Sequence, residues 1–573
     1  MIVFDVSGNI EQKSPLTLES HNSYLTIAGQ TSPDSGVTLK DYGLDIRSVA
    51  HDILLQHLHV RPGDTSIGGQ LTGWTLVTNS AYSVACPVKP DTHYHECGSV
   101  WWNGNRVCYT NGLLWEVGSN QWDWSGGVLY VNVGESPDNG VLEYGVSKSA
   151  ISDPLTINAG YDGDMARPPY RIVIDHNSFT WGGDMTLMSG GDYVTFCDNL
   201  ISESLGHHLH PKGPHSKGLY LLAYHEGKAG GHFTTIVRNM ISHSADRNPT
   251  ISAGYAAVAN NFLYDTGTTG SFMTDTVSAA RKGPVKAAFT ANVIQRPDRT
   301  RGTKPIQLRS RECLEERIYL AEDNMVDGVY ITNPWSNSVY VGQQYPWPTR
   351  APLPEHKRAA TREDAVWPSG YEPMPTPRVK EYVLENVGAR PAARDPVDTR
   401  LIGNVESNVA HIIVSQDDVG GWPVLAENTR ALTLPPDQDA IQPSGYTALE
   451  EWLHGYAAVV EGDHDGDGIP NARDPDDDND GMSDEDERIA GTDARDKDSV
   501  FRVEGGRRHG EEIRVALDSV TGRLYAVEWK EDLLGTNAWE DLTNNWPGTG
   551  GMMEFGDGAG ATQRFYRVRV HLP

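Results

Sequence analysis

The apolar residues in the middle of this chain form short β-type runs, and each run ends at an asparagine. A second apolar residue follows within two positions of that asparagine. The pattern recurs at Asn177, Asn199, Asn239, Asn261, Asn292 and Asn324, with steps of 22, 40, 22, 31 and 32 residues. A period of this length predicts a parallel β-helix, in which each coil buries its apolar side against the next and the longer steps carry loops.

The chain before and after this repeat extends the prediction. The β-type runs at 25–31 and 53–60 fit earlier coils of the same stack. Stacked asparagines at a bend would hydrogen-bond to one another and to the backbone along the stack. Helices are expected near 379–387 and 448–458. A β-sandwich with coincidental asparagine turns is the alternative to the β-helix.

Two further segments have β-type patterns of their own. Residues 71–150 contain six of the fifteen tryptophans, which either form the core of an inserted β module or stack on sugar rings. Residues 500–573 alternate as short antiparallel strands do. We therefore predict an all-β protein. Its expected segments are 1–70, N-terminal coils; 71–150, the inserted β module; 151–445, the main β-helix with a proline-rich wrapping segment; 460–499, acidic repeats; and 500–573, a small C-terminal β-sandwich.

Composition limits the partners of the chain. The 573 residues carry a formal net charge of −30, which argues against a nucleic-acid partner. No apolar run approaches the length of a membrane span. The acidic, glycine-rich and aromatic-rich composition is typical of an extracellular protein, so we expect a secreted monomer whose export signal precedes residue 1. Cys86, Cys97 and Cys108 are close enough in sequence for one disulfide, with buried thiols as the alternative.

One acidic segment has the spacing of calcium-binding loops. Positions 1, 3, 5, 6, 9 and 12 of a first loop are Asp463, Asp465, Asp467, Gly468, Asn471 and Asp474, and those of a second loop are Asp476, Asp478, Asp480, Gly481, Asp484 and Glu487. Calcium takes six to eight oxygens from a turn that needs glycine at position 6, so two calcium loops are predicted. They resemble thrombospondin type 3 or dockerin-like repeats and are expected to stiffen a linker. A solvated acidic linker is the alternative.

Stacking of coils also brings charged residues together. The residues seven positions after three successive repeat asparagines are Asp184, Gly206 and Asp246, so Asp184 and Arg247 should share one face two coils apart. The loop at 207–218 contains four histidines and two lysines. We expect this loop to form a cationic lip beside the carboxylate, with a transition-metal site as the alternative.

These passages together resemble polysaccharide lyase family 1, the pectate lyases. The matches cover residues 1–70 and 151 to about 425. They include IVFDVSG at 2–8, LTIAGQT at 25–31, VRPGD at 60–64, IDHNSFTW at 174–181, ISESL at 201–205, HPKGPHSKG at 210–218, DRNP at 246–249 and NNFLY at 260–264. The resemblance implies a right-handed parallel β-helix, which agrees with the period of the asparagines.

The resemblance also implies calcium-assisted β-elimination in an acidic polysaccharide, polygalacturonate or pectin. This reaction removes a proton from the carbon next to a uronate carboxylate and expels the O4-linked sugar. By motif match, Arg247 is the base and Lys212 neutralises the substrate carboxylate. Because a guanidinium is protonated at neutral pH, His210, His215 or His243 is the alternative proton acceptor.

A calcium site at Asp153 and Asp184 is implied by the same resemblance. A methionine stands four residues after Asp184, where the family has a further carboxylate. We expect Lys217 to bind substrate together with Lys212 and Arg247. The alternatives are a glycoside hydrolase with paired carboxylates, a non-catalytic carbohydrate-binding protein, a lyase for another uronate polymer, or a surface ion pair as the only role of Arg247.

Overall fold

Short apolar runs form the strands of this chain, and strands from successive coils pair in parallel. The computed structural model describes residues 1–63, 69–78, 81–86, 100–103, 105–109, 121–125, 128–144, 153–157, 168–206, 216–221, 233–252, 254–267, 272–275, 284–298, 305–309, 316–335, 339–341, 353–471, 473–509, 512–534, 536–558 and 563–573. The chain divides into two units, 1–453 and 454–573. The longest helix is too short and too polar to cross a bilayer, as is every other helix among the described residues.

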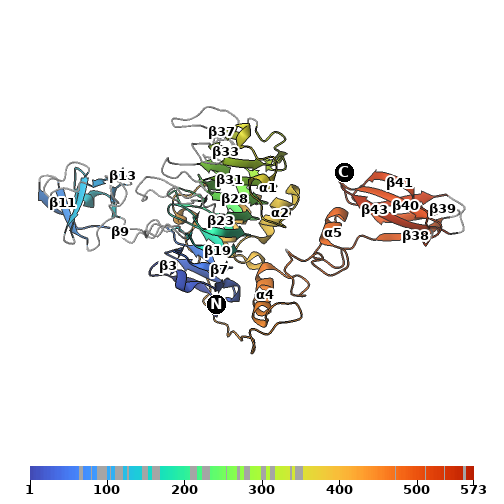
Figure 1. Cartoon of the computed structure of the whole chain (residues 1–573), viewed down its shortest axis with the longest axis horizontal. Coiled ribbons are helices and arrows are strands. Elements are labelled where there is room, and N and C mark those ends of the chain that lie inside the picture. Colours follow the sequence, from blue (N-terminus) through green and yellow to red (C-terminus); the bar gives the residue numbers. More distant parts are fainter. Residues whose placement is uncertain are drawn as a thin grey trace. The chain divides into compact units, whose positions relative to one another are not determined.

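Three long sheets make up most of the first unit (Figure 1). Sheet 1 contains β1 (Ile2–Val3), β4 (Leu25–Ala28), β7 (His51–Gln56), β19 (Tyr170–Asp175), β22 (Asp192–Cys197), β25 (Phe233–Val237), β28 (Gly254–Ala259), β31 (Val285–Thr290) and β34 (Glu316–Leu320). Sheet 2 contains β2 (Gly8–Glu11), β5 (Val37–Lys40), β8 (His59–Arg61), β20 (Ser178–Thr180), β23 (Leu200–Ser202), β26 (Met240–Ser242), β29 (Phe262–Tyr264), β32 (Val293–Gln295), β35 (Met325–Val326) and β36 (Val329–Tyr330). Sheet 3 contains β3 (Leu16–Leu18), β6 (Leu44–Ile46), β18 (Leu155–Ile157), β21 (Leu187–Ser189), β24 (Leu219–Leu221), β27 (Thr250–Ile251), β30 (Phe272–Asp275), β33 (Ile306–Arg309) and β37 (Val339–Val341).

Each coil contributes one strand to each sheet, apart from the last, which adds both β35 and β36 to sheet 2, and this is the arrangement of a parallel β-helix. Between described strands, every pairing in the three sheets is parallel except that of β35 with β36. The apolar side chains that face inward stack in register: Ile174 on Phe196, Phe196 on Ile236, Ile236 on Val258 and Val258 on Phe289. All of these side chains are fully buried. This parallel, in-register stacking confirms the predicted β-helix. A single coil could not bury its apolar side without its neighbours.

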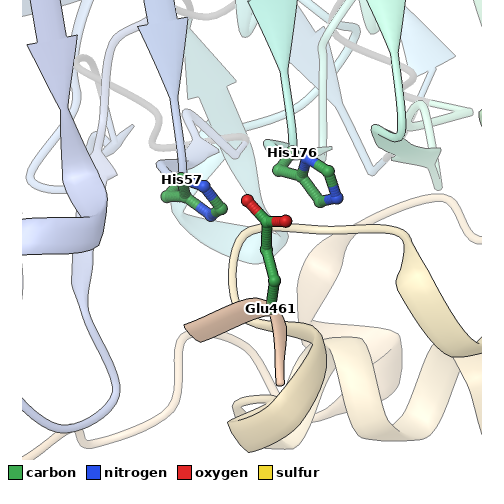
Figure 2. A group of neighbouring side chains, drawn as sticks. All are labelled: His57, His176 and Glu461. Atoms are coloured by element: carbon green, nitrogen blue, oxygen red, sulfur yellow. The ribbon is translucent and has the colours of Figure 1, made fainter. Parts of the chain in front are cut away.

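The corner between sheets 1 and 2 is built from a left-handed residue followed by an asparagine. In five coils the residue just before the repeat asparagine has a positive φ, between 50° and 58°. These residues are His176, Asp198, Arg238, Asn260 and Ala291. Such a φ is uncommon for residues with a Cβ and makes the chain turn sharply. At the equivalent corners the rings of His57 and His176 stack, with centroids 5.3 Å apart (Figure 2).

The asparagines at this corner form a continuous hydrogen-bonded ladder, as the sequence predicted. The Oδ1 atom of Asn239 accepts both the backbone N–H and the side-chain Nδ2–H of Asn199, at 3.0 and 2.9 Å. Asn239 in turn donates its backbone N–H and its Nδ2–H to Asn261 Oδ1, both at 3.0 Å. The same pair of bonds links Asn177 to Asn199, Asn261 to Asn292 and Asn292 to Asn324. The ladder sets the register of one coil on the next.

The segment after the last coil packs on sheet 1 through its first helix and on sheet 2 through the next two. Its helices are α1 (Arg362–Ala365), α2 (Thr376–Asn386) and α3 (Pro396–Glu406). Val383 of α2 and Leu401 of α3 pack on Met240 and Phe262 of sheet 2. The sequence predicted α2 but missed α3, which begins at a proline behind Asp395, whose carboxylate accepts the N–H groups of the first turn.

A buried ionic cluster holds the wrapping segment to the coils. Arg61 is fully buried and forms ion pairs with Asp395 and Asp398. Burial acts to raise the pKa of the Asp395 carboxyl, but the charge of Arg61 lowers that pKa overall. Ser178 Oγ donates a 2.5 Å hydrogen bond to Asp398 Oδ2. Removing Arg61 would leave two buried carboxylates without their arginine partner, so the cluster specifies where the segment docks.

The inserted segment forms two small sheets of its own. Its strands are β9 (Gly69–Gln70), β10 (Thr75–Thr78), β11 (Ala81–Ala85), β12 (Val100–Trp102), β13 (Asn105–Arg106), β14 (Cys108–Tyr109), β15 (Gln121–Ser125), β16 (Val128–Asn132) and β17 (Leu142–Tyr144). Trp74 and Trp122 are buried in the core between them. Cys86 is a buried thiol rather than half of a disulfide. Cys97 and Cys313 lie outside the described residues.

The remaining elements are short helices and the sheets of the second unit. The 3₁₀ helices include η1 (Ser20–Asn22), η2 (Gly29–Thr31), η4 (Pro137–Asn139), η7 (Glu355–Lys357), η8 (Pro391–Ala393) and η9 (Gln416–Val419). The C-terminal elements are α4 (Ala448–Glu461), α5 (Asp484–Ala490), β38 (Val503–His509), β39 (Glu512–Asp518), β40 (Leu524–Lys530), β41 (Glu540–Pro547), β42 (Met552–Asp557) and β43 (Phe565–His571). The strands form two antiparallel three-stranded sheets around Tyr525, Val527 and Phe555. Both the predicted helix near 448–458 and the small C-terminal β fold are confirmed.

Asn239→Ala should destabilise the β-helix strongly. The substitution removes the acceptor of two buried N–H groups of Asn199, and each unsatisfied buried group costs about 1–3 kcal/mol. We expect the free energy of unfolding to fall by at least about 2 kcal/mol in chemical denaturation. Asn428→Ala should change it by less than about 1 kcal/mol, because this exposed side chain makes only a surface hydrogen bond to Asp34. Equal losses in the two variants would contradict a structural ladder.

Candidate functional site

Four charged residues stand in the turns that lead into consecutive strands of sheet 3. Asp153 precedes β18, Asp184 precedes β21, Lys217 precedes β24 and Arg247 precedes β27, each by two or three residues. These strands are neighbours in the sheet. Neighbouring strands lie about 4.8 Å apart, so the turns form a row along one edge of the coil stack. This row of four residues is the candidate site.

Backbone hydrogen bonds fix the order of the turns. The N–H of Thr186 donates to Lys217 O at 2.8 Å, and the N–H of Gly218 donates to Asp246 O at 2.9 Å. Lys217 also pairs with Asp246 as an isolated parallel bridge. Lys217 therefore lies on the coil between Asp184 and Arg247.

That middle position differs from the one expected from residue counting. Counting from the asparagines placed Gly206 there, but the N–H of Gly206 donates to Ile413 O at 2.8 Å and the coil resumes only with β24. Gly206 thus bonds to a residue outside the row, so a fixed offset from the asparagine does not identify the next residue of the row. Asp184 and Arg247 do lie two coils apart, as predicted.

The two carboxylates at one end of the row differ in their surroundings. Asp153 Oδ1 accepts the backbone N–H of Met185 at 2.8 Å. Burial raises the pKa of the Asp153 carboxyl well above its usual value, and the negative charge of Asp184 raises it further. Asp184 forms an ion pair with Lys217. The two acids are thus close enough to repel each other, and one of them is partly neutralised.

Lys217 is placed among three charged groups of the row. Burial lowers the pKa of the Lys217 ammonium, and the nearby charge of Arg247 lowers it further. The charges of Asp184 and Asp153 act in the opposite direction. Its side chain is only 12% exposed, so the pair with Asp184 is stronger than an ordinary surface ion pair.

Arg247 has a strained backbone and a guanidinium held against an aromatic ring. Its φ is +58°, in the left-handed region, and its N–H donates to Asp246 Oδ1 at 2.8 Å. The guanidinium carbon lies 4.2 Å from the centre of the Tyr220 ring, a cation–π contact. One guanidinium nitrogen lies 3.2 Å from the sulfur of Met185. Backbone strain that surrounding contacts maintain is typical of functional positions.

An apolar patch lies beside these charges. Met185 and Tyr220 are buried together, and Met188 packs against them. The Tyr220 hydroxyl accepts a 2.8 Å hydrogen bond from Ser252 Oγ, which holds the ring in place. Met188 stands where the resemblance implied a further carboxylate, so this position supplies no carboxylate ligand for a metal ion.

The other residues predicted for the site fall into two groups. His210, Lys212 and His215 lie outside the described residues. His243, the third alternative proton acceptor, is fully buried: its Nδ1 lies 3.0 Å from Asp265 Oδ2 and its Nε2 lies 3.3 Å from Asn404 Nδ2. A buried ring with both nitrogens engaged cannot reach a polymer, so His243 is excluded as the base.

Asp153 and Asp184 fit a divalent cation in part. Calcium prefers six to eight oxygens, and two carboxylates supply at most four. The mutual repulsion that raises the pKa of Asp153 is the kind of interaction that a cation relieves. The site therefore suits an ion whose remaining oxygens come from a bound polyanion and from water.

The acidic loops in the second unit gather their carboxylates as the spacing predicted. Ligand atoms of Asp463, Asp465 and Asp467 lie within 4.8 Å of one another, and so do those of Asp476, Asp478 and Asp480. At position 9 of each loop, the side-chain oxygen of Asn471 or Asp484 accepts the N–H of the residue at position 2, at 2.8 Å in both loops. The thirteen-residue repeat is thus present in the geometry as well as in the sequence.

Two curated proteins are similar in sequence to this chain, both described as probable pectate lyase C. The one from Aspergillus flavus is 25% identical over 364 residues, which cover 56% of this chain and 76% of that protein. The one from Emericella nidulans is 26% identical over 304 residues, which cover 50% of this chain and 63% of that protein. No family model matches the chain.

The solved structures that this chain matches include an allergen and a pectate lyase. Jun a 1, the major allergen from cedar pollen, has a TM-score of 0.34 and 14% identity, over 65% of this chain and 76% of that chain. The pectate lyase from Acidovorax avenae subsp citrulli has a TM-score of 0.33 and 12% identity, over 68% of this chain and 67% of that chain. In sequence, the chain is a distant relative of the probable pectate lyases.

Proposed function

We propose that this chain is a secreted polysaccharide lyase that cleaves polygalacturonate by β-elimination. The observation that supports this most directly is the row of Asp153, Asp184, Lys217 and Arg247 along one edge of the coil stack. Lys217 and Arg247 can bind a polymer that has a carboxylate on every sugar, and Asp153 and Asp184 can share a cation with those carboxylates. The distant similarity to probable pectate lyases favours the same substrate class.

In this reaction Arg247 removes the proton from the carbon next to the uronate carboxylate. The electrons of that C–H bond form a double bond to the neighbouring ring carbon, and the bond from that carbon to the bridging oxygen breaks. The leaving oxygen takes up a proton from water, and Arg247 returns the proton it took to the solvent, so the products are one unsaturated end and one saturated end. Contact with Tyr220 and Met185 holds the guanidinium in position, which lowers the entropic cost of reaching the reactive geometry.

Lys217 neutralises the substrate carboxylate in this proposal, because its ammonium is the cation that lies between Asp184 and Arg247. Lys212 keeps the same role as a prediction from the motif. Calcium would be held by Asp153 and Asp184, where it would draw electron density from the substrate carboxylate and acidify the adjacent C–H bond. Lys217 competes with such an ion for Asp184.

Polygalacturonate should yield products with the ultraviolet absorbance of unsaturated ends. Arg247→Ala should lower the rate by about 10²–10⁴-fold, the usual contribution of an acid–base group. Arg171→Ala is the matched control, because Arg171 is an exposed arginine in sheet 1, and its activity should match the native chain. New reducing ends without ultraviolet absorbance would indicate a hydrolase, and binding without turnover would indicate a carbohydrate-binding protein.

Arg247→Lys separates a base from a residue that only stabilises charge. A lysine amine loses its proton roughly 2–3 pH units below a guanidinium. If the residue at position 247 takes the proton, the lysine variant should keep measurable activity and its pH profile should lie at lower pH than that of the native chain. The measurement is kcat/KM against pH for both proteins. Superimposable profiles with a uniformly lower rate would assign Arg247 to charge stabilisation instead.

Lys217→Met should raise KM for polygalacturonate by about tenfold or more, since a charged hydrogen bond contributes about 1.5–3 kcal/mol. Lys217→Arg keeps the charge and should recover part of the loss. The penalty should be smaller on methyl-esterified pectin, whose carboxylates are uncharged. An equal penalty on both polymers would show that Lys217 acts through the structure of the site rather than on the substrate charge.

A further inference from the structure

A stripe of outward-facing side chains runs along sheet 1, with one residue in each of five successive coils. Its members are Tyr193 on β22, Phe233 on β25, Tyr255 on β28, Lys286 on β31 and Arg317 on β34. The last four are paired directly with one another in the register of the sheet. Tyr193 stands opposite Phe233, since the next pair along the same two strands is Val194 with Thr234. Neighbouring strands lie about 4.8 Å apart, so the stripe follows the axis of the coil stack.

The three aromatic side chains of the stripe contact one another and are open to solvent. The rings of Tyr193 and Phe233 are stacked, with centroids 5.2 Å apart, and Phe233 meets Tyr255 edge to face at 5.0 Å. Tyr193 is 60% exposed and Phe233 is 37% exposed. Asp192 Oδ1 accepts the backbone N–H of both residues, at 3.0 and 2.9 Å, and so holds them side by side. Aromatic rings that are exposed as a group, rather than singly, are typical of a binding surface.

The stripe continues from the aromatic rings into two cations. Lys286 Nζ lies 5.2 Å from the centre of the Tyr255 ring, a cation–π contact. Arg317 is exposed, stands directly opposite Lys286 in the sheet and donates to His356 O at 2.9 Å. Among the residues that the structure describes, none forms an ion pair with Arg317. Like charges directly opposite each other disfavour strand pairing, whereas a carboxylate near both cations would be attracted by both.

The acids beside the stripe are already engaged. On the coil before it, Arg171 forms an ion pair with Asp52 at 2.6 Å, and this neutral pair ends the stripe. Asp192 accepts the two backbone N–H groups described above. Glu316 is buried and paired with Lys357 at 2.8 Å. Among the described residues, the charge that the stripe offers is therefore positive, in a chain whose net charge is −30.

The stripe and the candidate site lie at opposite ends of the strands of sheet 3. In each coil the chain passes from the turn that carries the site, through sheet 3, into sheet 1. Asp184 comes before β21 and Tyr193 after it, and Arg247 comes before β27 and Tyr255 after it. The two surfaces therefore run along the same coils, separated by the short strands of sheet 3.

We propose that the stripe is a second, non-catalytic binding surface for an acidic polysaccharide. Sugar rings of the polymer stack on the three aromatic rings, and uronate carboxylates bind Lys286 and Arg317. A polymer held there raises the effective concentration of substrate at the site on the other side of sheet 3. The choice of a polyuronate rests on the proposed function, whereas the surface itself rests on the geometry and charge of the stripe.

The test is affinity electrophoresis of the intact chain in polygalacturonate, with all proteins carrying Arg247→Ala so that the polymer stays whole. Phe233→Ala and Arg317→Ala should each raise the dissociation constant at least about fivefold, because each removes a direct contact with the polymer. Arg317→Lys keeps the charge and should recover part of the loss. Tyr330→Ala is the matched control, because Tyr330 is 44% exposed on β36 of sheet 2, and it should bind as the parent does.

Stability and kinetics separate this surface from the lyase site. The midpoint of chemical unfolding should be the same in all variants, and Tyr193→Ala takes the place of Phe233→Ala if that protein unfolds. With Arg247 intact, Phe233→Ala should lower kcat/KM on long polygalacturonate and leave it unchanged on short oligomers that occupy only the site. Polymer binding that Phe233→Ala weakens, in a chain that cleaves nothing, would support the surface and rule out the lyase.

Three results would overturn the proposal. The first is unchanged binding in both Phe233→Ala and Arg317→Ala. The second is equal binding of polygalacturonate and its fully methyl-esterified form, which would show that the cations of the stripe do not bind carboxylates. The third is a native dimer in sedimentation velocity that Phe233→Ala dissociates, which would make the stripe an interface between two copies of the chain.

Discussion

Six consecutive coils of this protein are held together by buried asparagines, from Asn177 to Asn324, whose side-chain oxygens accept the amide hydrogens of the preceding coil. Asn239, for example, receives two bonds from Asn199 and donates two to Asn261. Buried N–H groups must have partners, so a coil cannot slip by one residue without losing bonds on both sides. The apolar stack of Phe196, Ile236 and similar residues reinforces the same register. Everything that the surface presents depends on this alignment.

The alignment turns short connecting segments into a row of functional groups. The strands of sheet 3 are only two to four residues long, and the charged side chains stand in the turns before them. Each turn is anchored by backbone bonds to its neighbours, such as the one from Gly218 to Asp246 O. A strained residue such as Arg247 can be maintained there because the coils on both sides are rigid. The scaffold therefore supplies precision that an isolated loop would lack.

Charge is distributed unevenly, and this matters for a polyanionic substrate. The chain carries a net charge of −30, which would repel such a polymer at long range. Within about a Debye length, however, the charges closest to the polymer determine its electrostatic interaction with the protein. In the proposed site these include Lys217 and Arg247. A substantial share of the acid belongs to residues 461–487 in the second unit, where the carboxylates face one another in two loops. Bound cations there would lower the repulsion within the unit.

The sequence by itself determined the β-helix, the asparagine ladder and the loop spacing around Glu487, because each is a short local pattern repeated at a constant offset. It also placed Asp184 and Arg247 on one face. Only the tertiary structure decided that Lys217, rather than Gly206, lies between them, because Gly206 bonds to Ile413 whereas Lys217 pairs with Asp246. It likewise excluded His243, whose burial depends on contacts with residues distant in sequence. Local repeats predict stacking, whereas insertions and long-range packing can be read only from coordinates.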